Sequence, residues 1–163
     1  MKAKILGLLL LTVVMAIPAF AGYEIFLAVD NVAGTPADIK HTDWISVTEI
    51  QDNTIKTAGT ISLVITKPID GRSAALYRSC LSGMRHPHAT MDVCKDGVLM
   101  YRTSMDDITI SQIRPEFTKK DTDPKEEISF NFKTINWEFY TTGADGKPAT
   151  TRGGWDNVLK RAM

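Results

Sequence analysis

The stretch SAALYRSCLSGMRHPHATMDVCKDGVLMYRT, residues 73–103, decides the fold class because it contains one helix followed by one hairpin. Residues four apart, such as Leu76 and Cys80, share one face, and this spacing predicts a helix over Ser73–Ser82. The serine that opens this helix, Ser73, can cap its N-terminus, and Gly83 suits the left-handed position just after its end. This is the one helix that the sequence predicts.

The second half of the same stretch predicts a β-hairpin. Asp96-Gly97 is the dipeptide that best accepts the positive φ angles of a type I′ turn. It is flanked by two runs rich in β-forming residues, His88–Lys95 and Val98–Thr103. Two such runs separated by this dipeptide predict an antiparallel pair of strands.

Strand patterns fill most of the remaining chain. The further strands expected are Tyr23–Val29, Trp44–Ile50, Thr60–Thr66, Asp107–Ile113, Glu127–Tyr140 with a bulge near Thr134, and Trp155–Leu159. The segments expected to be loops or turns are 30–41, 51–59, 114–124 and 141–154. Many short strands with one helix favour a mainly β fold, a closed or nearly closed β-barrel of two sheets with one flanking α-helix. A sheet with apolar inner faces must close or be covered to hide its edges.

The first 21 residues have the composition of a secretory signal peptide. Two lysines form a short positive segment, Ile5–Ile17 is an uncharged apolar run, and Ala19–Ala21 places small residues where a signal peptidase requires them. A membrane anchor is the alternative, but the apolar run is shorter than the roughly 20 residues that cross a bilayer. We therefore expect cleavage after Ala21 and a secreted or periplasmic protein, residues 22–163, with no membrane contact after cleavage.

Residues 22–163 have the length of one domain that can bury its own core. The chain has 19 basic and 19 acidic residues, so loss of the two leader lysines leaves 17 basic residues and a net charge of −2. This balance offers no bulk attraction to nucleic acid or to an anionic membrane. No nucleic-acid partner and no cofactor are expected.

Two blocks of the chain carry the motifs of a known family. The first contains Ile69-Asp70, Ser73, Leu76-Tyr77-Arg78, Cys80, Ser82-Gly83, and Pro87 before His88-Ala89. The second contains Glu127-Ile128-Ser129-Phe130, Thr134-Ile135, Glu138-Phe139-Tyr140 and Gly154-Trp155-Asp156. In order and spacing these blocks, with the opening strand from Gly22, resemble the tube protein of bacterial type VI secretion, the Hcp family.

The resemblance implies a tight barrel of two sheets with one flanking helix. It also implies a non-enzymatic structural protein that self-associates into a hexameric ring, stacks into a tube and carries effector proteins or binds secretion components. Two features depart from the family, which ordinarily has no signal peptide and has a longer loop between its second and third strands. The alternative function is an exported monomeric barrel that binds a small ligand or a host surface through its loops.

Few residues suggest catalysis or metal binding. His86 and His88, with His41, could hold a metal ion, but the proline between the first two fits a connector from helix to strand better. Ser82, His86 and Asp92 could form a catalytic triad, yet no nucleophile motif surrounds the serine. We therefore expect no catalytic residue, no metal site and no enzyme activity.

The two cysteines and the aromatic residues leave alternatives open. Cys80, in the predicted helix, and Cys94, in the following strand, could form a disulfide in an oxidising compartment if their Cα atoms come within about 7 Å. Two separate thiols are the alternative. The aromatic residues that could stack on a sugar or peptide are Tyr23, Trp44, Trp137, Phe139 and Trp155. Packing in the core or at an interface is the more usual role of such residues in strands.

Overall fold

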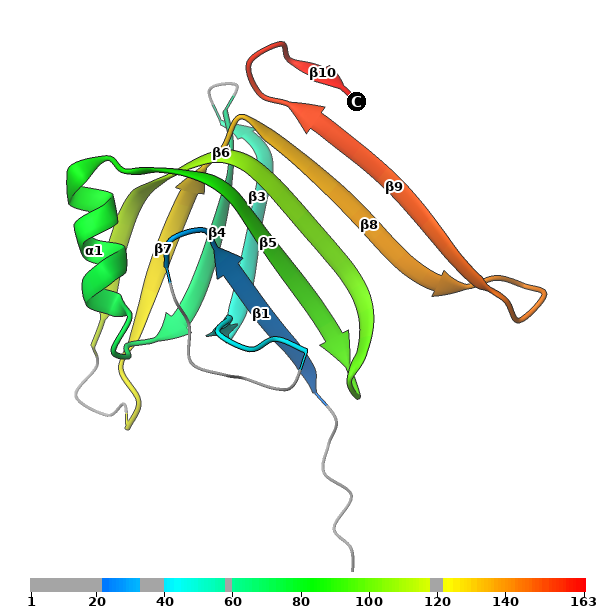
Figure 1. Ribbon diagram of the computed structural model, residues 1–163, viewed down its shortest axis with the longest axis horizontal. Coiled ribbons are helices and arrows are strands. Elements are labelled where there is room, and N and C mark those ends of the chain that lie inside the picture. Colours follow the sequence, from blue (N-terminus) through cyan, green and yellow to red (C-terminus); the bar gives the residue numbers. More distant parts are fainter. Residues whose placement is uncertain (1–21, 33–39, 58–59, 118–121) are drawn as a thin grey trace, which may run out of the picture.

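The computed structural model of the chain describes residues 22–32, 40–57, 60–117 and 122–163 (Figure 1). These residues form β-strands and one helix, α1 (Ser73–Ser82), which flanks the strands on one side. The described part is therefore mainly β with one short helix, as the sequence predicts. The predicted signal peptide lies outside the described residues. No helix within the described residues is long and apolar enough to span a membrane.

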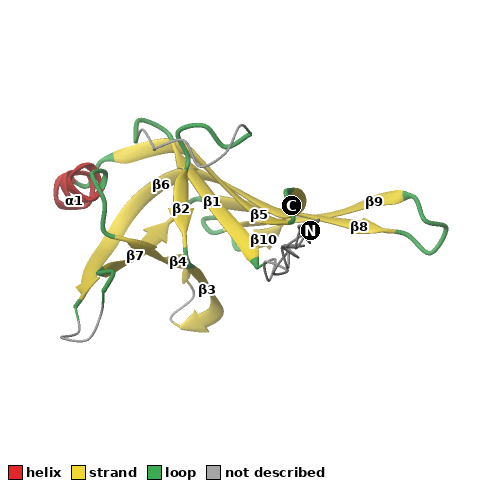
Figure 2. Cartoon of the chain, turned by 90° about the horizontal axis from the view of Figure 1, so that it is seen from below, coloured by secondary structure: helices red, strands yellow, loops and turns green. Residues whose placement is uncertain are grey.

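The strands are β1 (Tyr23–Val29), β2 (Ile45–Val47), β3 (Glu49–Thr57), β4 (Thr60–Pro68), β5 (Arg85–Lys95), β6 (Val98–Glu116), β7 (Lys125–Asn131), β8 (Thr134–Thr142), β9 (Pro148–Asp156) and β10 (Arg161–Ala162). Every strand pair is antiparallel. One path of neighbours runs β10-β9-β8-β6-β5-β1-β2, while β7 joins β6 to β4, and β4 joins β7 to β3. Hydrogen bonds therefore connect the described strands into one sheet, which Figure 2 shows strongly curved.

Strand β6 joins the two parts of this sheet because it changes partner along its length. Its residues up to Asp106 pair with β8, and its residues from Thr109 onward pair with β7. Between them Asp107 has a φ of 53°, a left-handed conformation that interrupts a regular strand. The sequence predicts two strands here, and the structure has one long strand with this irregularity.

Strands β2 and β3 also act as one strand with a change of partner. β2 pairs with β1, and β3 pairs with β4. Thr48, the residue between them, donates hydrogen bonds from its backbone N–H (2.8 Å) and its hydroxyl (3.0 Å) to the carbonyl of Thr66 in β4. The continuous segment of β2 and β3 thus changes its partner from β1 to β4, and Thr48 keeps a backbone hydrogen bond at the point of change.

The core lies where the inward-facing positions of these strands meet. Alternate residues of a strand point to the same face, so each strand contributes every second side chain. Fully buried examples are Leu27 in β1, Met91 in β5, Met105 in β6, and Ile128 and Phe130 in β7. Burying an apolar side chain of this size contributes roughly 1.5–3 kcal/mol. The core therefore depends on strands from both ends of the chain.

The local signals in residues 73–103 are mostly confirmed. The helix has the predicted bounds, and Gly83 after it has a φ of 65°. Asp96 and Gly97 both have positive φ, as a type I′ turn requires, and they join β5 to β6. The cap prediction is wrong, since Arg72 is the N-cap residue and makes no side-chain capping bond. The Ser73 hydroxyl is used elsewhere, in a buried polar network described below.

Several segments predicted as loops are strands. Residues 51–57 belong to β3, 114–116 to β6 and 148–154 to β9. The predicted strand Glu127–Tyr140 is two strands, β7 and β8, and the predicted strand Trp155–Leu159 covers only the end of β9 before a turn. β9 has no apolar alternation, and its sequence contains two adjacent glycines. It is a strand because β8 pairs with it along its whole length, which overrides its weak intrinsic preference.

Candidate functional site

The β8–β9 hairpin, residues 134–156, projects from the rest of the fold (Figures 1 and 2). β8 pairs with β6 only as far as Phe139, whereas its pairing with β9 continues to Thr142. The outer part of the hairpin therefore has support from its own two strands alone. A two-stranded ribbon is marginally stable by itself in water.

The face of the hairpin that continues the core is apolar. Ile135 is buried in the core, and Trp137 and Phe139 follow at alternate positions of the same strand. Trp137 is half-buried, and 47% of Phe139 is exposed. The Phe139 ring lies 4.9 Å from the ring of Tyr101 in β6. We call Tyr101, Trp137 and Phe139 the hairpin patch, an apolar row that loses its cover as it leaves the core.

The opposite face of the same strands carries a row of alternating charges. Asp92, Arg102, Glu138 and Arg152 lie opposite one another on β5, β6, β8 and β9. Arg102 donates two hydrogen bonds of 2.7 Å to the Asp92 carboxylate, and Arg152 Nε donates one of 2.8 Å to Glu138. The Tyr140 hydroxyl, which donates to Glu138, and the Arg152 guanidinium hold the pKa of Glu138 below its usual value. We call the four charged residues the charge ladder.

His41 covers the buried end of the charge ladder. Its Nε2 lies 3.0 Å from Asp92 Oδ2, and its ring stacks on Phe26 at 4.2 Å and meets the edge of Trp44 at 4.9 Å. His41 and Asp92 are both buried. The segment that contains His41 is thus fixed to the sheet by a hydrogen bond to Asp92 and by aromatic packing.

The predicted catalytic combination of Ser82, His86 and Asp92 is not assembled. His86 Nδ1 lies 2.7 Å from the carbonyl oxygen of Asp30, which can only accept, so Nδ1 carries the proton. The Ser79 hydroxyl then donates to His86 Nε2. Both side chains are buried, Ser82 donates instead to the Ser79 carbonyl, and Asp92 belongs to the charge ladder. The Ser79–His86 pair therefore holds helix α1 against the segment after β1.

The histidines considered for a metal site lie in different surroundings. His86 is buried, whereas 68% of the His88 side chain is exposed and its Nδ1 lies 2.7 Å from Asp106. Thr134 also donates to this carboxylate, and these two hydrogen bonds lower the pKa of Asp106. Within the described ranges, no three histidine, cysteine, aspartate or glutamate side chains gather as metal ligands would.

Cys80 and Cys94 are two thiols rather than a disulfide. Cys80 lies in the last turn of α1, close to where β5 begins, and Cys94 lies near the far end of β5 (Figure 1). A strand rises about 3.3 Å per residue, so the run from Arg85 to Cys94 spans roughly 30 Å. This separation far exceeds the reach of a disulfide, and the alternative of two separate thiols describes this structure.

The aromatic residues do not form one platform. Trp44 packs on His41, while Trp137 and Trp155 pack against the core. Tyr23 is exposed at the start of β1, with Lys95 Nζ 5.9 Å from its ring centre. Only Phe139 is both largely exposed and next to another aromatic ring. Core packing therefore accounts for Trp137 and Trp155, and packing on His41 accounts for Trp44.

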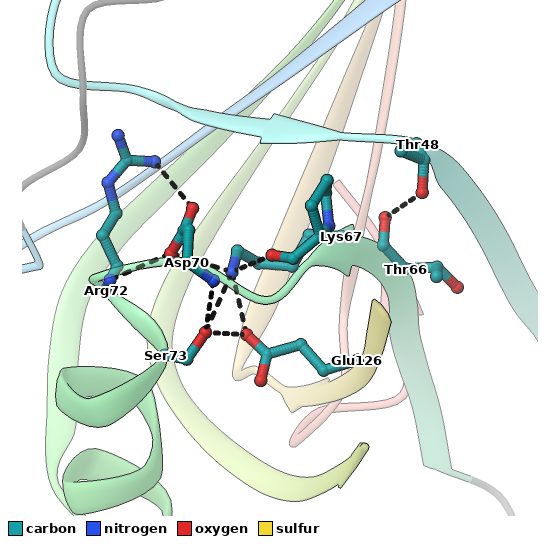
Figure 3. A network of polar contacts seen from close by, with 8 residues as sticks. Thr48, Thr66, Lys67, Asp70, Arg72, Ser73 and Glu126 are labelled. Atoms are coloured by element: carbon teal, nitrogen blue, oxygen red, sulfur yellow. Dashed lines mark hydrogen bonds and ion pairs between the residues drawn. The ribbon is translucent and has the colours of Figure 1, made fainter. Parts of the chain in front are cut away.

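A buried polar network that the sequence analysis did not identify joins α1 to strands β4 and β7 (Figure 3). Lys67 and Glu126 are both 0% exposed, and Lys67 Nζ lies 2.8 Å from Glu126 Oε1. Lys67 Nζ also donates to the carbonyl of Pro68 at 2.6 Å and to Asp70 Oδ1 at 3.1 Å. The Ser73 hydroxyl donates to Glu126 Oε1 at 2.8 Å and accepts the Asp70 N–H at 3.0 Å. The start of the helix is thus held by buried charges.

Asp70 connects this network to the surface. Burial tends to raise the pKa of Asp70, but the N–H of Arg72 and the ammonium of Lys67 together lower it below its usual 3.8. A carboxylate with a lowered pKa stabilises the folded state at neutral pH. This contribution is lost only as the pH falls below about 4 and the carboxylate is protonated.

Comparison with known proteins identifies relatives of this fold. The family model described as "Type VI secretion system effector, Hcp" matches residues 26–139, from β1 into β8. The crystal structure of Hcp1 from Salmonella typhimurium is 24% identical with a TM-score of 0.75, covering 86% of this chain and 99% of that chain. Hcp2 from the same organism is 25% identical with a TM-score of 0.71, covering 85% and 98%. A type VI secretion system effector from Yersinia pestis is 20% identical with a TM-score of 0.69, covering 81% and 98%. No curated protein matches the chain.

Proposed function

The chain belongs to the Hcp family of type VI secretion system effectors, and from this premise we propose that it is a structural protein that assembles into a ring. The family membership confirms the resemblance carried by the two sequence blocks. Hcp proteins are structural proteins of secretion rather than enzymes, so the chain is non-enzymatic. In keeping with the family, we expect six copies in the ring and partner proteins carried in its lumen.

The hairpin patch is the observation that carries this proposal. Tyr101 and Trp137 pack against the core, whereas Phe139, next along the same face of β8, is 47% exposed on a hairpin that projects from the rest of the fold (Figure 2). An exposed apolar face of this kind on a projecting hairpin is typical of a protein interface. A neighbouring copy that covers the patch would bury these aromatic rings and also support the marginal outer ribbon.

We also infer that the strands of one copy close into a barrel. The path β1-β5-β6-β7-β4-β3 returns to β1 through β2, because β2 and β3 are joined at Thr48. The two hydrogen bonds from Thr48 to Thr66 support this closure. A closed barrel would give the ring rigid subunits and would leave the β8–β9 hairpin as an arm outside the barrel.

Replacing Phe139 by serine is expected to convert the ring to monomers without unfolding the chain. The substitution removes an aromatic anchor from the interface, which we expect to weaken each contact by about 1–2 kcal/mol. Light scattering on a sizing column, with images of the eluted peak, measures the mass directly. The matched control is Phe117→Ser, since Phe117 is 70% exposed at the end of β6, away from the hairpin, and this variant should keep the ring.

Two results would contradict the ring proposal or the role of the hairpin patch. A monomeric wild-type protein at high concentration would favour an exported monomeric binding module, and thermal-shift screening against sugars, metals and peptides would then search for its ligand. A Phe139→Ser variant that keeps the wild-type mass would move the interface away from the patch.

We propose that the chain is exported and that its leader is cleaved after Ala21, which would place the ring outside the cytoplasm. β1 begins at Tyr23, so cleavage there would leave the first strand intact. The intact mass of the secreted or periplasmic protein should correspond to residues 22–163. Ala19→Arg should remain uncleaved, because the peptidase requires a small residue at this position. Full-length wild-type protein confined to the cytoplasm would contradict the proposal.

A further inference from the structure

A surface hollow of about 420 Å³ lies where strand β6 changes its partner from β8 to β7. Its volume is within the range of roughly 300–1,000 Å³ that small-molecule sites occupy. We call it the charged hollow, and its lining residues are Arg85, His86, Pro87, Asp106, Asp107 and Lys133. None of these residues belongs to the hairpin patch, so a ligand site here is independent of the proposed ring.

The left-handed conformation of Asp107 brings two neighbouring carboxylates to this hollow. In a regular strand, neighbouring side chains point to opposite faces. Met105 and Ile108 are both buried in the core, however, and the two residues between them, Asp106 and Asp107, both line the hollow. The φ of 53° at Asp107 makes this arrangement possible. Strand irregularities of this kind re-aim side chains and are frequent beside functional sites.

One basic side chain lies on each side of these carboxylates. Arg85 is on β5, with its Nε 3.3 Å from Asp107 Oδ1. Lys133 is in the connection between β7 and β8, where its backbone N–H donates to the Asp106 carbonyl at 2.9 Å. The Thr134 hydroxyl is the largest cause of the lowered pKa of Asp106, and the nearby Lys133 ammonium also contributes. Within the described ranges, no carboxylate forms an ion pair with Lys133, so its ammonium is open to a ligand.

The charges of the hollow favour a zwitterion over a simple ion. Two carboxylates and two basic groups sum to zero, so an anion or a cation alone would meet a like charge as well as an opposite one. A metal ion is disfavoured, because no three ligating side chains gather in the part of the chain that the structure describes. A compact molecule with one ammonium and one carboxylate satisfies both kinds of group through charge-assisted hydrogen bonds. An α-amino acid carries these two groups on one carbon atom.

We propose that the charged hollow binds the zwitterionic head group of a free α-amino acid. The ammonium of the ligand donates to the carboxylates of Asp106 and Asp107, and its carboxylate accepts from the ammonium of Lys133. Arg85 uses its Nε for Asp107, so its other N–H groups can donate to the same ligand carboxylate. The site thus recognises the two charges that every amino acid shares.

Titration calorimetry of the purified protein with each of the common L-amino acids tests the ligand class. At least one amino acid should bind. Its N-acetyl derivative lacks the ammonium and its amide lacks the carboxylate, so each should bind roughly tenfold or more weakly. If no amino acid binds, or if either derivative binds as tightly as the parent, recognition of a zwitterion is overturned.

Two variants test whether the amino acid binds in the charged hollow. Asp107→Asn removes the carboxylate charge, and asparagine accepts the left-handed conformation, so this variant should keep its melting temperature. Lys133→Gln removes the ammonium but keeps the backbone N–H that donates to Asp106. Each variant should raise the dissociation constant of the amino acid roughly tenfold or more.

Matched controls make the same two changes away from the hollow. Asp145→Asn and Lys147→Gln alter an ion pair at the exposed turn of the β8–β9 hairpin, and both should bind the amino acid like the wild type. Unchanged affinity in Asp107→Asn and Lys133→Gln would place the binding elsewhere and overturn the proposal, whatever the state of the ring.

Discussion

Replacing Glu126 by alanine is expected to lower the free energy of unfolding by about 3–5 kcal/mol. Lys67 is fully buried, and the variant removes the carboxylate that lies 2.8 Å from its ammonium. The ammonium keeps Asp70 at 3.1 Å, but Asp70 is itself shared with Arg72. An under-compensated buried charge is among the most destabilising single defects. Urea denaturation of wild type and variant measures the loss.

The neighbouring residue provides a matched control for this prediction. Glu127→Ala makes the same chemical change, but the partner of Glu127 is Arg114, whose side chain is 60% exposed. An exposed pair contributes about 1 kcal/mol or less, so this variant should remain close to wild type. Equal losses in the two variants would contradict a special role for the buried pair.

A double variant separates the charge effect from the loss of packing. Lys67→Met with Glu126→Leu replaces both charges by apolar side chains of similar size. Buried ion pairs replaced in this way often leave stability unchanged or improved, so most of the loss in Glu126→Ala should be recovered. A double variant as unstable as the single one would show that hydrogen bonds to Ser73, rather than the charge balance, stabilise the start of α1.

The sequence predicts the parts of the fold that have local signals. The bounds of α1, the left-handed Gly83 and the Asp96-Gly97 turn each depend on residues that are close in the chain. The resemblance to the Hcp family likewise depends on blocks of adjacent residues, and the family model confirms it.

The sequence does not predict features that depend on pairing between distant residues. β9 is a strand because β8 pairs with it, and nothing in its own composition indicates this. The ion pair of Lys67 and Glu126 joins strands that are adjacent only in the folded sheet. Phe139 is visible in the sequence as an aromatic residue in a strand, but its exposure follows from the end of β6 pairing. The exposed position of Phe139, and with it the candidate interface, therefore could not be predicted from the sequence alone.

Replacing Asp92 by alanine is expected to lower the free energy of unfolding by about 2–3 kcal/mol, as measured by urea denaturation. Asp92 is buried, accepts two hydrogen bonds from Arg102 and contacts His41. Its loss leaves the buried His41 without this partner carboxylate. The loss should be smaller than for Glu126, because 36% of the Arg102 side chain is exposed and water can solvate it.

Asp145→Ala is the matched control, since Asp145 pairs with Lys147 at the exposed turn of the hairpin and its loss should cost about 1 kcal/mol or less. Comparing the stabilities of Asp92→Ala and Asp145→Ala shows whether the charge ladder is stabilised by the buried Asp92 or consists only of solvated surface charges. If the ladder is anchored at Asp92, Asp92→Ala must be clearly less stable than Asp145→Ala, and Asp92→Asn should be intermediate because an amide can still accept one hydrogen bond from Arg102. Equal stabilities would mean that the alternating charges are surface pairs only.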